Sequence, residues 1–448
     1  MFVTISCVSA HAQINNPAET TKIKVENRTN QKIDQTIDRG LDKLEEGIDG
    51  LFNGENKKGK NRKEKNNSSN SQQTIDNSNN SSGSNSKNNS SNSNANNNGY
   101  DPAVTNTDNN GNTDYSAYKN FNFIPGEQII FFEDFKDGSK SRWGAYDIEN
   151  EVNVQSYDGA NWLEVKSGAF YPLGLKALPK NFTLEFDVYT PDINTGSLDI
   201  RFVDQSQAGA LGDPWLDNSS HVTFTPKTHM PKTGLGSYQK KINNEELNPQ
   251  NEFRFYSWLP ESGEYYARIS LSCNNGRVSV WVNKEQVLDN IDLLASNIQY
   301  LLSFHLQNYF VAENRMYLTN FRLATGVANP KTELESNKKF ITQNIYFDVN
   351  SDVIRPNSYA TLKEIAQSIN SIQGNILIVG HTDSDGSDAA NLELSKKRAE
   401  SVKRALVNEF GLDANRLSTD GKGESVPLNK NSNPSEKAAN RRVEFIKQ

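Results

Sequence analysis

The chain has 448 residues, of which 34% are hydrophobic and 23% are charged, and its formal net charge is −7. This length allows roughly two or three domains, but a mean hydropathy of −0.75 is too low for a chain that is globular throughout, so part of it is expected to be unfolded. The mixture of both charges argues against a nucleic-acid partner, and no apolar run is long enough to predict a membrane-spanning helix.

The first residues, MFVTISCVSAHAQ, are similar to the end of a secretory signal peptide. Residues 10–12 (AHA) fit the small-x-small cleavage rule, which predicts that residues 1–12 are a signal-peptide remnant. The basic start is missing and the apolar segment is short, so we interpret the first Met as a start codon assigned too late. An alternative is that Cys7 is a lipidation site, although Thr4 stands where Leu or Val is usual.

Residues 13–52 are predicted to contain one amphipathic helix. Its apolar residues are alternately four and three positions apart, which is the spacing of a coiled-coil seam: Ile37, Leu41, Leu44, Ile48 and Leu51. The run extends over only about two to three heptads, which is marginal for an independent coiled coil. Self-association or partner binding through residues 33–51 is therefore a hypothesis, and the alternative is a helix that frays or packs on a neighbouring element.

Residues 53–120 are predicted to be a disordered tether. A basic segment, NKKGKNRKEK, precedes an Asn- and Ser-rich run with almost no apolar residue to bury. Such a composition cannot offset the entropy of ordering the chain. About 70 residues of this kind behave as a flexible coil with a root-mean-square reach of about 45 Å.

Residues 121–326 are predicted to form an antiparallel β-sandwich. Short β-rich runs such as NFTLEFDVYT, SLDIRFVD and RVSVWVNK recur at intervals of about 8 to 15 residues. Turn signals separate these runs, including Asp137-Gly138 and Asn274-Asn275-Gly276, and helical periodicity is scarce. Cys273 lies in one of the runs and is expected to be a buried small hydrophobe without a redox role.

Three segments, ALPKNFTLEFDVYTP, GRVSVWVNKEQVLD and MYLTNFRLATG, make this region similar to laminin-G and concanavalin-like jelly rolls. The resemblance implies a glycan or protein ligand. Aromatic side chains in strands are more often part of the core than of a sugar site, so no ligand residue is assigned among the candidates Trp143, Trp215, Trp258, Tyr265 and Tyr266.

Glu185 and Asp187 resemble the start of the ExDxxE nucleophile strand of jelly-roll glycosidases. Those enzymes need two carboxylates that flank a glycosidic bond. Thr190 stands where the third acid of the motif should be, so we do not expect an enzyme.

A linker, residues 327–340, leads to a predicted α+β domain, residues 341–448. Apolar β-branched runs alternate there with segments of helical period. Pro356 and Asn357 are start signals for the first helix, and Gly411 is a stop signal for the second. The predicted order is βαβαββ, with strand 345–348, helix 358–372, strand 376–379, helix 391–410, strand 417–420 and strand 442–446.

Asp383 begins a polar loop after the second of these strands, and Arg398 lies on the helix that follows. Four residues share one face of that helix: Asn391, Ser395, Arg398 and Val402. A carboxylate beside a guanidinium suits a zwitterion, because Asp accepts from an ammonium and Arg binds a carboxylate through two parallel N–H bonds. The alternative is a surface ion pair worth about 0 to 1 kcal/mol.

The C-terminal domain contains four separated motifs: IYFDVNSDVI at 345–354, GHTD at 380–383, NxxLSxxRAxxV at 391–402 and NRRVEF at 440–445. In identity and order they resemble the OmpA-like C-terminal domain, a peptidoglycan-binding family shared by porin-type outer-membrane proteins, peptidoglycan-associated lipoprotein and flagellar motor stators. Within the second motif, His381 is interpreted as structural.

The resemblance implies that Asp383 and Arg398 hold the amino and carboxylate groups of diaminopimelate in the peptidoglycan stem peptide. The further ligand-binding positions that it implies are Asn391 and, as weaker matches, Thr382, Asn350 and Arg441. It implies no cofactor and no metal.

Our hypothesis from the sequence is a non-enzymatic anchor in the periplasm, or on the periplasmic face of the outer membrane, of a diderm bacterium. Peptidoglycan is its expected partner, and envelope proteins or glycans are candidate partners of the sandwich. The alternative is a carbohydrate-binding or carbohydrate-processing envelope protein whose sandwich carries the activity and whose C-terminal domain only localises it.

Overall fold

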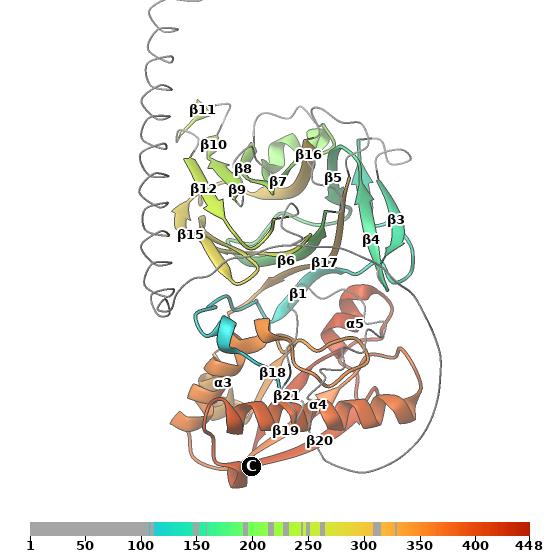
Figure 1. The fold of residues 1–448 in the computed structure, drawn as a ribbon, viewed down its shortest axis with the longest axis vertical. Helices are drawn as coiled ribbons and strands as arrows, with labels where there is room; N and C mark the ends of the chain where they lie inside the picture. The colour runs from blue at the N-terminus through green and yellow to red at the C-terminus, as the bar shows by residue number, and fades with distance from the viewer. Residues whose placement is uncertain are drawn as a thin grey trace, which may run out of the picture. The chain divides into compact units, whose positions relative to one another are not determined.

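The computed structural model describes residues 107, 112–146, 152–157, 159–190, 196–213, 219–226, 233–242, 245–247, 251–259, 265–307, 315–327 and 329–448. The expectations for the signal-peptide remnant, the N-terminal helix and most of the tether lie outside the described residues. The described part contains a β-sandwich and a C-terminal α/β domain, which confirms the predicted fold class (Figure 1). None of its helices combines the length and apolarity that crossing a bilayer requires.

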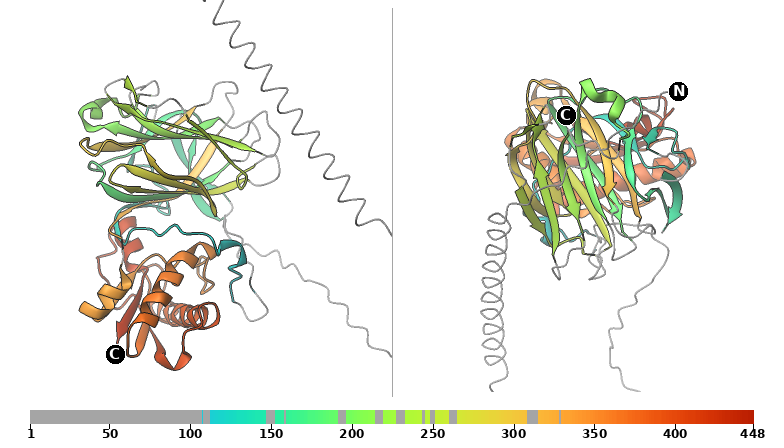
Figure 2. Two further views of the ribbon diagram at one scale, coloured as in Figure 1. Left: turned by 90° about the vertical axis from the view of Figure 1, so that its left-hand side faces the viewer. Right: turned by 90° about the horizontal axis from the view of Figure 1, so that it is seen from above.

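The sandwich consists of two antiparallel sheets that face each other (Figure 2). The first sheet has eight strands, in the order β15 (Glu285–Asp292), β14 (Arg277–Val282), β13 (Tyr266–Asn274), β6 (Asn181–Tyr189), β17 (Met316–Thr325), β4 (Ala160–Val165) and β3 (Val152–Tyr157), with β1 (Gln128–Glu133) also paired to β17.

The second sheet has seven strands, in the order β12 (Asn251–Phe255), β9 (Gly234–Gln239), β8 (Ser219–Thr225), β7 (Ser197–Asp204), β16 (Tyr300–Gln307), β5 (Gly168–Pro172) and β2 (Trp143–Ala145). A short separate ribbon is formed by β10 (Lys241–Ile242) and β11 (Glu245–Glu246), and two 3-10 turns are η1 (Ser116–Tyr118) and η2 (Gln205–Ala210).

Aromatic side chains from both sheets fill the space between them. The ring centroid of Phe321 lies 4.5 Å from that of Trp143, and it lies 5.3 Å from that of Phe186. Each of these fully buried side chains contributes about 1.5 to 3 kcal/mol to folding through its apolar surface. The core interpretation thus holds for Trp143 and also for the buried Trp258, whereas Tyr265 is 37% exposed. Trp215 lies outside the described residues.

The hairpin between β13 and β14 confirms one predicted turn signal. Asn275 and Gly276 adopt φ angles of 49° and 87°, the left-handed conformation that Asn and Gly tolerate in a tight turn. Cys273 is buried beside this turn, and burial raises the pKa of its thiol to about 11. A thiol in that state is not a reactive nucleophile at neutral pH.

The C-terminal domain has a four-stranded sheet with helices against it. The sheet order is β18 (Lys339–Thr342), β21 (Val443–Lys447), β19 (Ile376–His381) and β20 (Leu417–Gly423), and only the β19–β20 pair is parallel. The helices are α2 (Pro330–Ser336), α3 (Tyr359–Ser371), α4 (Asp388–Asn408) and α5 (Pro434–Asn440), with 3-10 turns η4 (Pro356–Ser358) and η5 (Ala414–Arg416). The helix predictions for α3 and α4 and the strand predictions for β19, β20 and β21 are confirmed to within a few residues.

The strand predicted at residues 345–348 is wrong. The first strand of the domain is β18, and Phe347 makes only an isolated bridge with Ile354. The backbone groups of Tyr346 and Asp348 are bonded to the loop that follows them, at residues 353–358. Because these backbone groups bond to the loop rather than to a neighbouring strand, the segment stays outside the sheet.

Two segments expected to be linkers are ordered instead. In the segment at 327–340, the side chain of Asn329 accepts a hydrogen bond from the backbone N of Thr332, and Pro330 starts α2. This is a helix N-cap followed by proline, a signal that the sequence analysis missed. Residues 112–120 of the predicted tether pack on the C-terminal domain, where Tyr115 is 4% exposed and its ring lies 5.6 Å from that of Tyr359.

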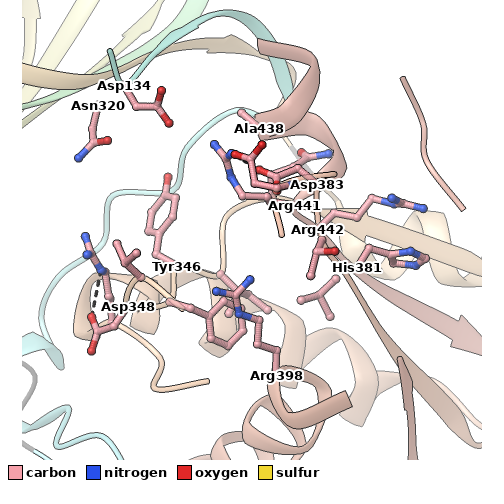
Figure 3. Close-up of a pocket in the computed structure, with 18 of the residues that line it drawn as sticks. Asp134, Asn320, Tyr346, Asp348, His381, Asp383, Arg398, Ala438, Arg441 and Arg442 are labelled. Atoms are coloured by element: carbon pink, nitrogen blue, oxygen red, sulfur yellow. Dashed lines mark hydrogen bonds and ion pairs between the residues drawn. The ribbon is translucent and has the colours of Figure 1, made fainter. Parts of the chain in front are cut away.

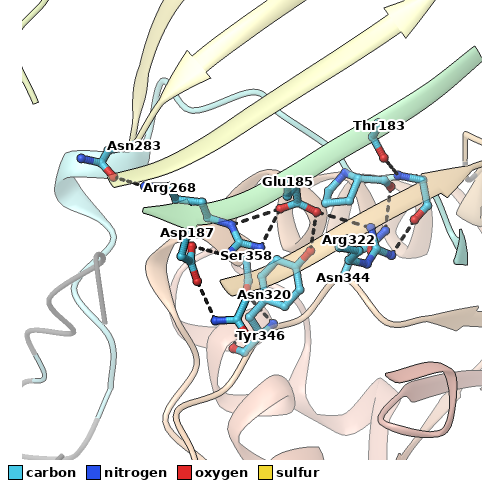
Figure 4. Close-up of polar contacts among 12 residues, drawn as sticks. Thr183, Glu185, Asp187, Arg268, Asn283, Asn320, Arg322, Asn344, Tyr346 and Ser358 are labelled. Atoms are coloured by element: carbon cyan, nitrogen blue, oxygen red, sulfur yellow. Dashed lines mark hydrogen bonds and ion pairs between the residues drawn. The ribbon is translucent and has the colours of Figure 1, made fainter. Parts of the chain in front are cut away.

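A buried polar network joins the sandwich to the C-terminal domain (Figure 4). Arg268 donates to Glu185 at 3.0 Å and to Asp187 at 2.7 Å, and the hydroxyl of Tyr346 donates to Glu185 at 2.9 Å. Both carboxylates are 1% exposed or less. The two acids of the glycosidase-like motif therefore form buried ion pairs with Arg268 at the junction with the C-terminal domain.

A bulge in β17 sends two further polar side chains into this network. The register between β17 and β6 shifts between Thr319 and Arg322, and Asn320 adopts a φ of 52°. The side chain of Asn320 donates to Asp187 at 2.7 Å, and the guanidinium of Arg322 donates to Asn344 of the C-terminal domain at 2.7 Å. The bulge thus places Asn320 in contact with the sandwich residue Asp187, and Arg322 in contact with the C-terminal domain.

We predict a pH dependence of stability from Glu127, which lies at the same junction and accepts from the hydroxyl of Thr342 at 2.9 Å. Burial raises the pKa of Glu127 to about 7. Because the folded state holds this proton between pH 4.5 and about 7 and the unfolded state does not, raising the pH through that window lowers the free energy of unfolding. Glu127→Gln should therefore gain about 1 to 3 kcal/mol relative to wild type between pH 5 and pH 8, measured by urea unfolding.

Glu252→Gln, at an exposed position on β12, is the matched control and should show no such change. Burial also raises the pKa of Glu133 to about 7. Because Glu133 is present in every variant, the free energy of unfolding of each variant is compared with that of wild type at the same pH. Parallel pH profiles for wild type and Glu127→Gln would contradict the assignment.

Candidate functional site

A cavity of about 270 Å3 lies where the C-terminal domain meets the end of β1 (Figure 3). Its walls come from the loop after β19, from α4, from residues 345–350 and from the segment around Arg441. All six ligand-binding residues expected from the sequence line this cavity: Asp383, Arg398, Asn391, Asn350, Arg441 and Thr382.

Asp383 lies in the loop between β19 and α4 and is 6% exposed. One carboxylate oxygen accepts a hydrogen bond from the backbone N of Asp385 at 3.1 Å, and the other accepts from Nη1 of Arg441 at 2.5 Å. The carboxylate is thus already neutralised by one arginine on the cavity wall. Arg441 was only a weak expectation from the sequence, and the structure makes it the direct partner of Asp383.

Arg398 projects from α4 into the same cavity. Its Nε donates to the carbonyl oxygen of Ser351 at 3.0 Å, and its guanidinium carbon lies 4.8 Å from the ring centroid of Phe347. Among the described residues, no carboxylate lies within ion-pair distance of this guanidinium. Burial, and then the charge of Arg441, lowers the pKa of Arg398 to about 10, so the group remains charged at neutral pH.

Asn391 holds the loop of Asp383 against α4. Its side-chain amide donates to the carbonyl oxygens of Asp383 at 3.3 Å and Asp385 at 3.1 Å, and to a carboxylate oxygen of Glu424 at 2.5 Å. These bonds use the donor capacity of the amide. The structure therefore shows a loop-ordering role for Asn391, in addition to its place on the cavity wall.

Besides the two ring nitrogens of His381, three polar atoms on the cavity walls are buried and lack a hydrogen-bond partner among the described residues. They are the Oγ1 atom of Thr382, the Oε1 atom of Gln343 and the Oδ1 atom of Asn357. Buried polar atoms without a partner cost about 1 to 3 kcal/mol each. Their gathering on one cavity indicates a place where a polar ligand is bound.

Asn350 and His381 differ in how deeply their side chains are buried. Asn350 is exposed at the edge of the cavity and adopts a left-handed φ of 54°. His381 is 3% exposed, and its Nε2 atom lies 3.5 Å from a carboxylate oxygen of Glu444. Burial raises the pKa of Glu444, but the contact with His381 and the hydrogen bonds from Lys339 and Arg442 outweigh it and hold this pKa below its usual range. His381 is thus buried beside the ion pair of Glu444 and Arg442, which is consistent with its interpretation as a structural residue.

The close approach of α4 to the sheet positions Arg398. A Cβ atom on Gly380 would lie 2.2 Å from the backbone oxygen of Ser395, one turn before Arg398 on α4. We predict that Gly380→Ala destabilises the protein by about 2 to 3 kcal/mol, because the helix must move away from β19. Thermal unfolding measures this, and Gly209→Ala, where a Cβ meets nothing within 4 Å, is the control. Equal melting temperatures for the two variants would contradict the close packing described for Gly380.

The contribution of the sandwich to this cavity could not be predicted from the sequence. Phe132, Asp134 and Lys136, at the end of β1 and just after it, line it together with the C-terminal residues. The backbone N of Phe132 donates to the hydroxyl of Ser435, which is 303 positions away, at 2.9 Å. No periodicity or motif relates positions so far apart, so nothing in the sequence signals this contact.

Residues 346–441 match the family model described as OmpA family. Outer membrane porin F of Pseudomonas aeruginosa is 41% identical over 101 residues, which are 22% of this chain and 29% of that protein. Outer membrane protein A of Bordetella avium is 41% identical over 101 residues, or 22% of this chain and 52% of that protein. The probable lipoprotein YiaD of Escherichia coli is 38% identical over 103 residues, or 23% of this chain and 47% of that protein.

Among solved structures, the peptidoglycan-associated lipoprotein from Burkholderia pseudomallei is similar at 34% identity, with a TM-score of 0.22, over 23% of this chain and 88% of that one. The chain spans between 29% and 52% of the length of the three curated relatives given above. The family match includes Asp383, Asn391 and Arg398, so the domain that supplies most of the cavity is an OmpA-family domain. The match does not extend to the sandwich.

Proposed function

We propose that the OmpA-family domain of this chain binds peptidoglycan non-covalently, through the free zwitterionic end of diaminopimelate in the stem peptide, and so acts as a non-enzymatic anchor in the cell envelope. One observation carries the proposal. The carboxylate of Asp383 and the guanidinium of Arg398 line the same cavity, and Arg398 has no carboxylate partner among the described residues.

The charges of the cavity suit a ligand that brings both an ammonium and a carboxylate. Asp383 supplies an acceptor for the ammonium, while Arg398 and Arg441 supply guanidinium donors for the carboxylate. Two arginines beside one aspartate leave an excess positive charge, and after burial the charge of Arg441 is the next cause that lowers the pKa of Arg398. A ligand carboxylate would cancel this excess, and the free hydroxyl of Thr382 offers a further hydrogen bond.

The size of the cavity also supports a small head group. Pockets for drug-sized ligands begin at about 300 Å3. A cavity of about 270 Å3 lies near the lower end of that range, so it suits the end of one amino acid better than a disaccharide of the glycan strand. On this basis the stem peptide, rather than the sugar backbone, is the part of peptidoglycan that enters the cavity.

Relatives of the domain are named outer membrane proteins or, in one case, a probable lipoprotein. These names support a location in the envelope of a diderm bacterium, in the periplasm or on the periplasmic face of the outer membrane. The sandwich, with its similarity to laminin-G and concanavalin-like jelly rolls, would then engage a second envelope component.

Binding of a glycan by the sandwich is the alternative function. Tyr157 is 43% exposed, and its ring stacks on that of Tyr189 at 4.5 Å, which in turn stacks on Tyr266 at 4.5 Å. Stacked, partly exposed aromatic rings suit the apolar face of a sugar. A glycan-binding and glycan-hydrolysis screen with the full chain and with Tyr157→Ala tests this alternative, which predicts that Tyr157→Ala loses a glycan ligand that wild type binds.

Co-sedimentation with purified sacculi tests the proposed function. The full chain should pellet with sacculi whose stem peptides contain diaminopimelate. Retention should fall on sacculi that carry lysine at that position, because lysine lacks the second carboxylate that Arg398 would bind. Equal retention on both kinds of sacculi would contradict the proposed ligand, and no retention on either would contradict peptidoglycan binding altogether.

A further inference from the structure

The cavity that holds Asp383 and Arg398 is not built by the OmpA-family domain alone. The end of β1 in the sandwich supplies part of its wall through Phe132 and Asp134, and Lys136 follows at its rim. Figure 3 shows Asp134 and Asn320, both from the sandwich, across from Asp383 and Arg441. A ligand in this cavity therefore meets side chains from both domains.

Phe132 contacts the arginine that neutralises Asp383. The guanidinium carbon of Arg441 lies 5.2 Å from the ring centroid of Phe132, while its Nη1 atom donates to Asp383 at 2.5 Å. The backbone N of Phe132 is itself fixed by the hydroxyl of Ser435 on α5, at 2.9 Å. Arg441 is thus held between a carboxylate of one domain and an aromatic ring of the other, an arrangement that limits where its guanidinium can lie.

Four charged side chains gather at the rim beside this contact, two from each domain. Lys437 donates to Asp385 at 2.6 Å, and Lys136 lies 3.7 Å from Asp134. The pKa of Asp385 is held below its usual range, first by the hydrogen bond from Lys437 and also by the nearby charges of Lys136 and Arg441. Lys136 is exposed, so its ammonium, which lies beside Asp134, can also meet a ligand group that extends out of the cavity.

We propose that the end of β1 is part of the peptidoglycan-binding site: Phe132 is a positioning residue that holds Arg441 beside Asp383, and Lys136 binds a carboxylate of the stem-peptide residue next to diaminopimelate. This inference rests on the proposed function and extends it from a single amino acid to a longer stretch of the stem peptide. It assigns the sandwich a role in recognition that is separate from any ligand of its own.

Titration calorimetry of the full chain tests the role of Phe132, with a diaminopimelate-containing stem tetrapeptide as the probe. Phe132→Leu keeps an apolar side chain but removes the π face, and it should weaken binding about fivefold. Phe132→Tyr restores the ring and should bind within about twofold of wild type. Rescue by tyrosine but not by leucine distinguishes a cation–π contact from simple packing, which both residues provide.

The role of Lys136 is tested with two probes, the tetrapeptide and free diaminopimelate. Lys136→Ala should weaken binding of the tetrapeptide about threefold and leave binding of free diaminopimelate unchanged, because only the tetrapeptide reaches the rim. Lys284→Ala, at an exposed turn of the sandwich, is the control and should bind both probes like wild type.

The outcomes separate this inference from the proposed function. If Asp383→Ala loses the tetrapeptide while Phe132→Leu and Lys136→Ala bind it like wild type, the cavity binds the ligand without the sandwich and the inference is wrong. If wild type itself does not bind the tetrapeptide, the proposed function fails and the inference fails with it.

Discussion

Replacing Arg398 with alanine should remove the protein from purified sacculi, with a loss of affinity of at least about 30-fold. The guanidinium is half-buried, stacks on Phe347 and carries no carboxylate partner among the described residues, so its favourable ion pair forms only with a ligand. Truncation of one partner in a buried, hydrogen-bonded charge pair costs about 2 to 5 kcal/mol. Lys397→Ala is the matched control, because Lys397 is the basic residue directly before Arg398 on α4 and its side chain is 58% exposed.

Asp383→Ala should have an equal or larger effect for a different reason. The variant loses the acceptor for the ligand ammonium, and it also leaves Arg441 without its carboxylate in the cavity. The uncompensated guanidinium would then repel the ammonium that Asp383 should attract. Co-sedimentation with sacculi measures both variants, and circular dichroism checks that each is folded. Retention of both folded variants at the level of Lys397→Ala would show that the two charges do not bind the ligand.

The second large effect concerns stability. Arg322→Ala should lower the free energy of unfolding by about 3 to 5 kcal/mol, because it breaks a buried ion pair and leaves Glu185 to share the guanidinium of Arg268 with Asp187. Arg322 is 2% exposed, lies 3.4 Å from Glu185 and also donates to Asn344 of the C-terminal domain. Loss of the Arg322 side chain therefore weakens both the sandwich and the junction between the sandwich and the C-terminal domain.

Urea unfolding measures this change, and Arg254→Ala on the edge strand β12 provides the control. Arg254 is exposed, so its replacement should change the free energy of unfolding by no more than about 0.5 kcal/mol. A loss below about 1 kcal/mol for Arg322→Ala would mean that Glu185 is satisfied without it, and the buried network would not stabilise the junction as described.

Much of the fold could be predicted because its signals are local. The alternation of apolar residues and the turn at Asn275-Gly276 predict strands and a hairpin, and the helical period after Asn391 predicts α4. The meeting of Asp383 and Arg398 in one cavity also follows from local order, because a strand, a short loop and a helix connect them.

The features that could not be predicted depend on contacts between distant residues. Arg441 reaches Asp383 across 58 positions, and Phe132 reaches Ser435 across 303. No period or motif relates Phe132 to Ser435, and the family resemblance implies Asp383 and Arg441 as ligand-binding positions without pairing them with each other. The wrong strand at 345–348 has a related cause, since IYFD has a strand-like composition but its backbone bonds to the loop after it.

The contacts of Glu185 and Asp187, the two acids of the glycosidase-like motif, could not be predicted from the sequence either. Glu185 and Asp187 lie two positions apart on β6, as the motif requires, and both side chains leave the sheet on the same side. Only the structure shows that Arg268 and the C-terminal Tyr346 cover them. A local motif thus gives the placement of two acids, while their surroundings are set by residues about 80 to 160 positions away.

The central claim is that an aspartate and an arginine in one cavity recognise the free zwitterionic end of diaminopimelate. The most direct measurement is calorimetric titration of the full chain with two stem tetrapeptides that differ only at the side-chain amine of diaminopimelate, which is free in one and acetylated in the other. The claim predicts that acetylation weakens binding at least about tenfold, because the ligand then has no ammonium for Asp383 to bind. Equal affinity for the two peptides would contradict it.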